Sequence, residues 1–202
     1  MAAREPAYQR LGVDERRRRL LELGVQLFSR YTYAELSMSA IAREAGISKA
    51  LLYHYFPSKQ GYFVATLQQQ AEELAERTAT DPSQRPTEQL MRALDAFLGW
   101  VEENADGYAK LLEGASTHAE VRELVDEVRS ATADRILDGL SPGTPPAPAL
   151  RAAVRGWLWF TDGAITDWLE HRDMDRDQLL GLLLGTLYGA ITASGEQPEA
   201  LS

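Results

Sequence analysis

Hydrogen-bond donors are concentrated in 23 residues that read SMSAIAREAGISKALLYHYFPSK, from Ser37 to Lys59. Hydroxyl and ammonium groups of this kind bind phosphate oxygens, and lysine can also bind the edge of guanine. The residues that we select for such contacts are Ser37, Ser39, Ser48, Lys49, Ala50, Leu51, Tyr53, His54 and Lys59. The stretch therefore indicates binding to a nucleic acid.

The same stretch has the pattern of two short helices joined by a tight turn. Ile41, Ala42 and Ala45 give the first helix an apolar face. Gly46 accepts the positive φ that a turn requires, because it has no Cβ. Ser48 can cap the second helix through its hydroxyl. This pattern predicts a helix-turn-helix, in which the second helix enters the DNA major groove.

Most of the selected side chains also have a purely structural interpretation. Ser37 and Ser39 can cap the first helix as well as donate to phosphate. Lys49 lies where a recognition helix meets base edges and could read guanine, or it could be solvated. Tyr53 and His54 would contact backbone phosphates, unless Tyr53 is a core residue with an exposed hydroxyl.

Lys59 follows Pro57-Ser58 at the start of the next expected helix. It could reach a phosphate beside that helix N-terminus, or it could be a plain surface lysine. If it binds a phosphate, Lys59→Ala should lower the slope of affinity against salt by about one unit per subunit.

The net charge of −9 taken alone disfavours binding to nucleic acid, but the distribution of the charge reverses that conclusion. Residues 1–63 hold 10 Lys+Arg and 6 Asp+Glu, a balance of +4, and the remainder has a balance of −13. This asymmetry indicates that only the N-terminal part contacts phosphate. The run Arg16 to Arg19 lies in the first turns of an expected helix, where cations oppose the helix dipole. A nearby phosphate is one candidate partner for these arginines.

Features of an enzyme are absent from the sequence. There are no cysteines, which excludes disulfides, thiolate metal sites and cysteine nucleophiles. His54, His118 and His171 form no metal-binding pair, and there is no HExxH, Gly-rich phosphate loop or GxSxG motif. We therefore expect no catalytic residue, no metal and no cofactor. A small helical enzyme is the alternative that these absences disfavour.

The pattern of apolar residues predicts an all-α fold with about nine helices. Asp14 can cap a helix that runs to about Arg30. The expected helices after the helix-turn-helix cover residues 60–80, 87–104, 107–114, 119–140, 150–171 and 175–193, with a proline-rich loop at 141–149. The charged N-terminus and the lack of a long apolar run predict neither signal peptide nor membrane span, and hence a cytoplasmic protein.

The residues from Phe28 through Phe56 resemble the TetR family of bacterial transcriptional regulators. The resemblance rests on LFSRYTYAELSMSAIAREAGIS, on the string Leu52-Tyr53-His54-Tyr55-Phe56, and on Ser58-Lys59. It covers about 50 to 60 residues, and the rest of the chain matches only in helix count and length. Ala50 and Leu51 depart from the family, which often has Gly or Pro followed by Thr or Ser, and Gln60 replaces the usual Glu. Leu51 could contact a thymine methyl instead of making a polar contact.

The resemblance implies a homodimer that binds a palindromic operator in double-stranded DNA. It implies a DNA-binding domain, at residues 13–73, and a helical domain at residues 74–195 that dimerises and binds a small-molecule effector. The last two long helices of each subunit would form a four-helix bundle. Repression relieved by ligand is the commoner outcome for the family, and an activator remains open. A C-terminal domain that only dimerises is the alternative.

Aromatic residues gather in the second half, which contains all four tryptophans. We select as candidate effector residues Trp100, Tyr108, Leu111, His118, Trp157, Phe160, Thr161 and Thr166. Trp157 and Phe160 are three apart and should share a helix face. Asp162 beside tryptophans would suit a cationic, flat, apolar ligand. The alternative is that these rings fill the core or the dimer interface.

An apolar stripe in residues 175–193 indicates a dimer interface. Leu179, Leu180, Leu183, Leu184, Leu187 and Ile191 form the stripe. Gly181, Gly185 and Gly189 recur every four residues, and each costs a helix up to about 1 kcal/mol relative to Ala. Such glycines indicate a close helix neighbour, either within the subunit or, as the resemblance favours, in the partner. The residues that we select for the interface are Leu180, Leu184, Gly185, Tyr188 and Gly189.

Overall fold

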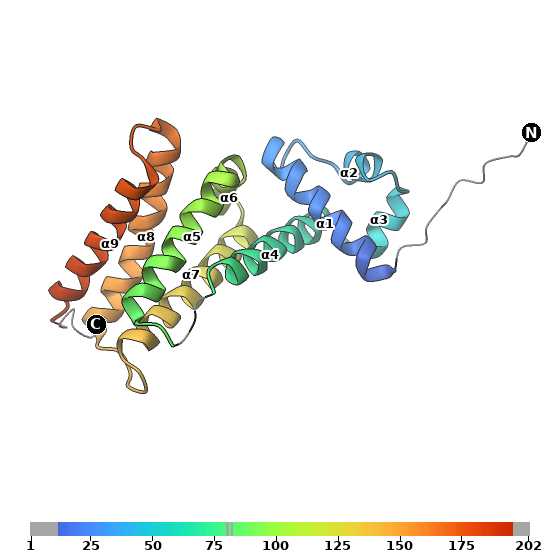
Figure 1. The fold of residues 1–202 in the computed structure, drawn as a ribbon. Coiled ribbons are helices and arrows are strands. Elements are labelled where there is room, and N and C mark those ends of the chain that lie inside the picture. Colours follow the sequence, from blue (N-terminus) through green and yellow to red (C-terminus); the bar gives the residue numbers. More distant parts are fainter. Residues whose placement is uncertain (1–11, 80, 82, 196–202) are drawn as a thin grey trace, which may run out of the picture. The chain divides into compact units, whose positions relative to one another are not determined.

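The computed structural model describes residues 12–79, 81 and 83–195. Every regular element within these residues is an α-helix, which confirms the expected all-α fold (Figure 1). The nine helices are α1 (Val13–Arg30), α2 (Met38–Glu44), α3 (Lys49–Tyr55), α4 (Lys59–Arg77), α5 (Pro86–Glu103), α6 (Ala105–Thr117), α7 (Ala119–Leu140), α8 (Pro148–His171) and α9 (Arg176–Ala193).

Two of these helices begin at prolines. We expected Pro148 to lie in the loop at 141–149, but it is the first residue of α8, and Pro86 likewise begins α5. A proline is well suited to this position because the first N–H of a helix has no partner within the helix. The proline-rich loop therefore ends at Ala147, the N-cap of α8.

The start of α1 differs from expectation. Gly12 is the N-cap, no side chain caps the helix, and Asp14 lies inside the first turn. The prediction that Asp14 caps α1 is therefore wrong. Its carboxylate still lies near the positive end of the helix dipole, as does that of Glu15.

The described residues form two compact units, which meet inside α4 at Gln69 and Gln70. We call the unit up to Gln69 the head and the unit from Gln70 the body. Each has its own apolar core. The head contains α1, α2, α3 and most of α4, and the body contains α5 to α9 together with the end of α4, whose Leu74 packs against the body core.

The head core is built around the contact between α1 and α4. Tyr62 of α4 is fully buried, and its hydroxyl donates to the carbonyl oxygen of Leu20 at 2.5 Å. Gly24 of α1 lies against the same part of α4, where an added Cβ would overlap Thr66 Oγ1 and lie 2.9 Å from Tyr62 Oη. Thr66 Oγ1 is itself held by the Tyr62 carbonyl at 2.9 Å. Glycine at position 24 thus lets the two helices approach closely.

The body core is centred on the pair α8 and α9, which lie side by side (Figure 1). Trp157 of α8 is buried, and its Nε1 donates to the carbonyl oxygen of Leu183 in α9 at 2.9 Å. The turn between the two helices ends α8 at Arg172, with φ 52°, and Asp175 then caps α9 in a capping box with Gln178. These contacts fix α8 against α9 within one protomer.

We expect Gly24→Ala to destabilise the head by about 1–3 kcal/mol, because the new methyl group overfills the contact between α1 and α4. Urea unfolding of the full chain measures this. Gly139→Ala is the matched control, since an added Cβ at Gly139 meets no atom within 4 Å. That control should be neutral or should gain about 0.4–1 kcal/mol. Equal effects of the two substitutions would contradict the close contact at Gly24.

Candidate nucleic-acid interface

The turn between α2 and α3 has the geometry that its residue types predict. Gly46 has a φ of +65°, and its N–H donates to the Arg43 carbonyl oxygen at 3.1 Å. Ser37 Oγ accepts from the N–H of Ala40, and Ser48 Oγ accepts from that of Leu51, both at 3.1 Å. The predicted caps are therefore present. Each closes the first turn of a short helix and so fixes its start.

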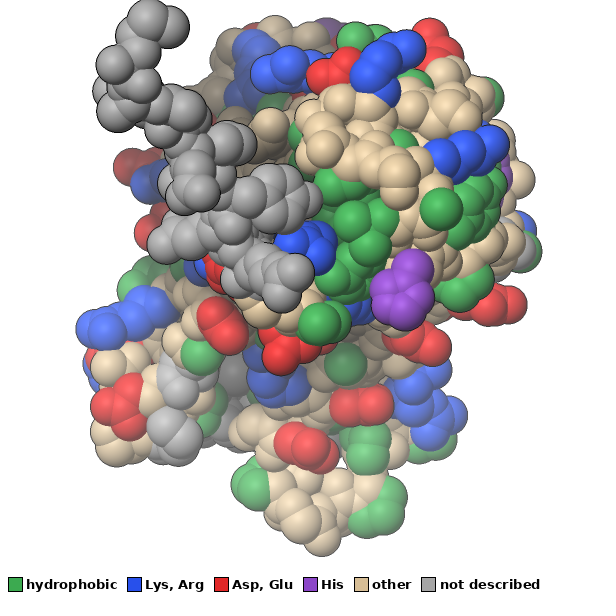
Figure 2. All heavy atoms as spheres, turned by 90° about the vertical axis from the view of Figure 1, so that its right-hand side faces the viewer, with side chains coloured by type: hydrophobic (Ala, Val, Ile, Leu, Met, Phe, Trp, Pro, Cys, Tyr) green, Lys and Arg blue, Asp and Glu red, His purple; other side chains and the backbone are tan. Residues whose placement is uncertain are grey.

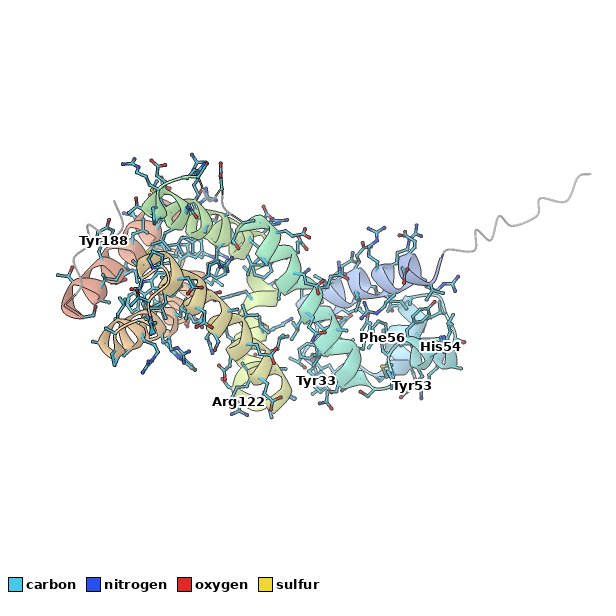
Figure 3. The ribbon with its side chains drawn as sticks, turned by 90° about the horizontal axis from the view of Figure 1, so that it is seen from below. Tyr33, Tyr53, His54, Phe56, Arg122 and Tyr188 are labelled. Atoms are coloured by element: carbon cyan, nitrogen blue, oxygen red, sulfur yellow. The ribbon has the colours of Figure 1, made fainter. Side chains whose placement is uncertain are left out.

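The two sides of α3 differ in burial. Leu52 has no exposed surface. Lys49, Ala50, Tyr53 and His54 are exposed. Figure 3 shows Tyr53 and His54 on α3. Tyr53 is thus not a core residue, and the alternative interpretation of it is excluded. The exposed side of α3 carries an ammonium, a hydroxyl and an imidazole group. These groups can donate hydrogen bonds to base edges and to phosphate oxygens.

The remaining selected residues of the helix-turn-helix are placed less simply. Ser39 is exposed on α2, and Leu51 of α3 is half-buried. The ammonium of Lys49 lies 5.8 Å from the centre of the Tyr53 ring, so these two side chains share one patch. Figure 2 shows basic and hydrophobic side chains close together on this side of the molecule, with acidic ones among them.

Lys59 is placed differently from our expectation. Its Nζ donates to the carbonyl oxygens of Tyr33 and Leu36, at 2.9 and 3.0 Å, and lies 4.1 Å from the centre of the Tyr33 ring. Two of its three donors therefore bind carbonyls within the head, and the half-buried side chain is more than a plain surface lysine. The phosphate contact of Lys59 stays a prediction.

Three of the four arginines at the start of α1 have partners within the chain. Arg18 and Arg19 bind Glu15, at 2.7 and 3.0 Å, and Arg17 lies 5.6 Å from the centre of the Phe56 ring. The hydrogen bonds from Arg18 and Arg19 lower the pKa of Glu15. Acidic groups of the same helix therefore offset part of the positive charge of these arginines, for which we had suggested a phosphate as the partner.

In the body, Trp100 and Tyr108 are brought together. Both are buried, and their ring centroids are 6.4 Å apart. Trp100 Nε1 is a buried donor with no hydrogen-bond partner. Buried donors normally have an acceptor. Among the candidate effector residues, Trp100 thus has a buried N–H that lacks one.

Tyr108 belongs to a polar network that joins α6, α7 and α8. Its hydroxyl donates to Asp162 at 2.8 Å, and Asp162 also accepts from Arg129 Nε at 2.7 Å. Burial and the adjacent Asp162 charge raise the pKa of Tyr108 well above its usual value. The guanidinium of Arg129 stacks on Trp159, 4.1 Å from its ring centre. Arg129 thus pairs with Asp162 within the protomer, so Asp162 offers no unpaired charge, and its attraction for a cationic ligand stays an untested prediction.

Other candidate effector residues are dispersed. Trp157 is buried, but Phe160 is 41% exposed, so the two are neighbours on α8 but only Trp157 lies in the core. Three residues along a helix leave the two side chains about 60° apart around its axis, which is enough to place Phe160 at the edge of the core. Thr161, four residues after Trp157, is the buried neighbour.

The last three members also lie apart from the network. Thr166 is exposed and bonds back to the Asp162 carbonyl oxygen at 2.8 Å. Leu111 is half-buried. His118 lies between α6 and α7, with Nδ1 2.7 Å from Thr117 Oγ1. Sequence reasoning missed Arg129, because nothing near it in the sequence marks it as a partner of residues 108 and 162.

The apolar stripe of α9 divides between two roles. Leu179, Leu183, Leu187 and Ile191 are almost completely buried within the protomer. Leu180 and Leu184 are partly buried against the same core. The four almost completely buried residues therefore belong to the protomer core, whereas Leu180 and Leu184 keep some exposed surface and stay predicted interface residues.

The glycine side of α9 is open. An added Cβ at Gly181, Gly185 or Gly189 would meet no atom of the described protomer within 4 Å. Among the described residues, then, no helix of the same subunit lies close to these positions. Tyr188 and Leu182 are 38% and 43% exposed on the same helix, and Trp159 of α8 is 61% exposed. Figure 3 shows Tyr188 on α9.

Two further searches cover the described residues alone. No helix among them is long and apolar enough to cross a membrane. No group of three or more His, Asp or Glu side chains within residues 12–79, 81 and 83–195 could hold a metal ion.

The chain matches known proteins along most of its length. Residues 20–66 match the family model for bacterial regulatory proteins of the tetR family, and residues 86–188 match the tetracyclin repressor-like C-terminal domain. The HTH-type transcriptional activator FasR of Mycolicibacterium smegmatis is 32% identical over 177 residues, 83% of this chain and 79% of that protein. The HTH-type transcriptional repressor KstR of Rhodococcus jostii is 28% identical over 170 residues, 81% and 77% of the two chains.

A solved structure agrees with these matches. A TetR-family transcriptional regulator from Streptomyces coelicolor has a TM-score of 0.80 and 34% identity, and the alignment covers 92% of this chain and 84% of that one. These proteins are transcriptional regulators and not enzymes. The chain therefore belongs to the TetR family and is a DNA-binding transcriptional regulator.

Proposed function

We propose that the protein acts as a homodimer on a palindromic operator, with α3 of each subunit in the major groove. The observation that carries this proposal is the difference between the two sides of α3. Leu52 anchors one side in the head, while Lys49, Ala50, Tyr53 and His54 remain exposed on the other. A helix held in this way can present its N-terminal residues to base edges.

The residues selected on α2 and α3 then have defined roles. Lys49 donates to the acceptors of guanine, and Leu51 contacts a thymine methyl beside Ala50. Ser37 and Ser39 at the start of α2, and Tyr53 and His54 on α3, donate to phosphates on either side of the groove. The Ser37 and Ser48 hydroxyls already accept from main-chain N–H groups, which leaves their own O–H free to donate.

We assign dimerisation to the open sides of α8 and α9. Glycines that cost helix stability and have no neighbour in the protomer are explained if a partner helix approaches them closely. Exposed Tyr188 and Leu182 supply apolar area beside them. Two such helices from each subunit form a four-helix bundle. DNA binding then belongs to residues 13–73, and dimerisation to residues 74–195.

The body is also our candidate for effector binding. The unpaired Trp100 Nε1 supports a ligand that carries a hydrogen-bond acceptor, such as a carbonyl or carboxylate, on an apolar body. One observation favours the second candidate, a body that only dimerises. The polar groups of Tyr108, Asp162 and Arg129 satisfy one another without a ligand.

The proposed mechanism is a population shift. The ligand-free dimer holds its recognition helices about 34–36 Å apart, which is one turn of DNA. An effector can bind more tightly to a dimer whose recognition helices have another spacing. It then lowers operator affinity by the ratio of its affinities for the two forms of the dimer. We propose repression relieved by the effector. The similar proteins include both an activator and a repressor, so a reporter assay in cells must decide the sign.

We expect Lys49→Ala to weaken binding to a duplex selected by the wild-type protein from a random library. The loss should be about 1–3 kcal/mol per subunit, with relaxed preference at the base pair that Lys49 contacts. Fluorescence anisotropy at several salt concentrations measures both effects. Lys110→Ala in α6 is the control and should leave affinity unchanged. Unchanged affinity in Lys49→Ala would remove the assigned contact, and failure to select any duplex would remove the function.

We expect Gly185→Leu to convert the dimer into monomers, because the added side chain occupies space that the partner helix needs. The protomer itself has room for it, since no described atom lies within 4 Å of the new Cβ. Sedimentation equilibrium measures the change, and circular dichroism should show unchanged helix content. Gly139→Leu on α7 is the matched control and should remain dimeric. A dimeric Gly185→Leu protein would show that the interface lies elsewhere.

We expect some acceptor-bearing apolar compound in a metabolite library to shift the affinity of the protein for its selected duplex. Trp100→Phe should reduce that shift by about tenfold in effector concentration, because one hydrogen bond to the ligand is lost. Its affinity for the duplex without a compound should be unchanged. If no compound alters duplex affinity, the body serves only for dimerisation.

A further inference from the structure

Four side chains from α6, α7 and α8 form a continuous series of contacts in the body. We call Tyr108, Asp162, Arg129 and Trp159 the Tyr108–Trp159 network. The Tyr108 hydroxyl donates to Asp162 Oδ1 at 2.8 Å, and the other carboxylate oxygen, Oδ2, accepts from Arg129 Nε at 2.7 Å. The Arg129 guanidinium lies on the Trp159 ring, 4.1 Å from its centre. A buried hydroxyl is thus connected to a ring on the surface of the body.

The Asp162 carboxylate is held at both of its oxygens, by a different partner at each. Arg129 Nη2 lies 2.6 Å from the same Oδ2, so two guanidinium nitrogens contact that oxygen. Arg129 Nη1 donates to Asp126 at 2.9 Å, so carboxylates of α7 and α8 both hold the guanidinium. A rotation of the Asp162 carboxylate must therefore move Arg129, and with it the contact to the Trp159 ring.

The ion pair in this network is largely removed from water. The side chains of Arg129 and Asp162 are 17% and 20% exposed. Removing two charges from water is costly, and replacing such a pair by apolar residues often leaves stability unchanged or raises it. The pair is therefore weak evidence for a stabilising role, and the two aromatic residues that it connects suggest another role.

The inner end of the network adjoins the candidate effector site. The Tyr108 ring lies 6.4 Å from that of Trp100, whose buried Nε1 has no hydrogen-bond partner. A tyrosine hydroxyl has a single hydrogen to donate, and here Asp162 receives it. A ligand acceptor that takes this hydrogen would leave Asp162 Oδ1 without its donor.

The outer end of the network lies on the open side of α8. Trp159 is 61% exposed, and it follows Gly156 by three residues and precedes Gly163 by four. Residues at this spacing share one side of a helix. An added Cβ at either glycine would meet no described atom within 4 Å. Trp159 therefore borders the surface of α8 and α9 to which we assigned dimerisation.

We propose that the Tyr108–Trp159 network couples the effector site of the body to the association of the two subunits. The bond from Tyr108 fixes Asp162, and Asp162 fixes the guanidinium of Arg129. That guanidinium fixes the Trp159 ring beside the surface on which a second copy of the chain packs. An effector that takes the Tyr108 hydroxyl releases Trp159 and weakens the association. This inference rests on the proposed dimer and effector site, and it adds a route between them.

The first experiment follows Trp159 by fluorine NMR of the full chain labelled with fluorotryptophan. The chain has four tryptophans, and Trp159→Phe identifies the Trp159 signal because that signal alone disappears. Tyr108→Phe removes the hydroxyl, keeps the ring, and so reproduces the loss of the bond to Asp162. It should shift the Trp159 signal, although residue 108 reaches Trp159 only through the network.

Tyr62→Phe is the matched control for this experiment. Tyr62 is also buried and also loses one hydrogen bond on substitution, but it belongs to the head. It should leave the Trp159 signal unchanged. All spectra are recorded at concentrations at which sedimentation shows the same oligomeric state. A Trp159 signal that ignores Tyr108→Phe, or that responds equally to Tyr62→Phe, would overturn the network.

The second experiment measures the dissociation constant of the dimer by sedimentation at a series of protein concentrations. Tyr108→Phe should raise this constant by about fivefold or more, which is the lower end of the usual range for coupled sites. In a Trp159→Ala background, the same substitution should change the constant by less than about twofold, because the coupling needs both ends of the network. Additive effects of Tyr108→Phe and Trp159→Ala would show that the two residues act independently and would refute the proposal.

Further outcomes separate this inference from the proposed function. If Tyr108→Phe does not fold, Arg129→Lys takes its place, because lysine keeps the charge but lacks the planar group that stacks on Trp159. A dimer whose dissociation constant is the same in wild type and variant would remove the coupling and leave the proposed dimer intact. A wild-type chain that is monomeric at every concentration would instead remove the proposed dimer, and this inference with it.

Discussion

The contact between α1 and α4 is the constraint on which the geometry of the head depends. Tyr62 is buried there, with its hydroxyl on the Leu20 carbonyl oxygen, and burial raises the pKa of that hydroxyl. The Tyr62 ring also contacts Phe56, 4.9 Å away between centroids, immediately after α3. The proposed recognition helix α3 is therefore supported by the packing of α1 against α4. A short helix such as α3 could not hold its position alone, because isolated helices of this length are unstable in water.

The head and the body use polar groups in different ways. In the head, hydroxyls cap short helices and one ammonium binds main-chain carbonyls, so the polar contacts define backbone positions. In the body, Tyr108, Asp162 and Arg129 form a network of side chains from three helices. Such a network is sensitive to the loss of any member, because a remaining buried partner keeps its desolvation cost. Any movement of α6 relative to α8 must therefore preserve or replace the bond between Tyr108 and Asp162.

Local chemistry made part of the structure predictable. The caps at Ser37 and Ser48 and the turn at Gly46 follow from residue type and spacing alone, and so do the limits of α7. The partners of Lys59 could not be foreseen, since they are carbonyls of an irregular segment 23 and 26 residues away.

Which side of a helix is buried was harder to predict than the presence of the helix. In α9, leucines and glycines occur on most sides, so periodicity could not tell the protomer core from an open surface. Phe160 was misplaced for a related reason: spacing relates residues to one another but does not say what lies opposite them. Only the packing of α8 on α9, for example Trp157 on Leu183, decided between the sides.

The distribution of tryptophan has a practical consequence for spectroscopy. Trp100, Trp157, Trp159 and Trp168 all lie in the body, and the head contains tyrosines but no tryptophan. Selective excitation of indole therefore reports on one unit alone. Three of the four rings are buried, and Trp159 is exposed beside a guanidinium, so its emission should be red-shifted and accessible to aqueous quenchers. Fluorescence can thus follow the unfolding of the body while remaining blind to events at α3.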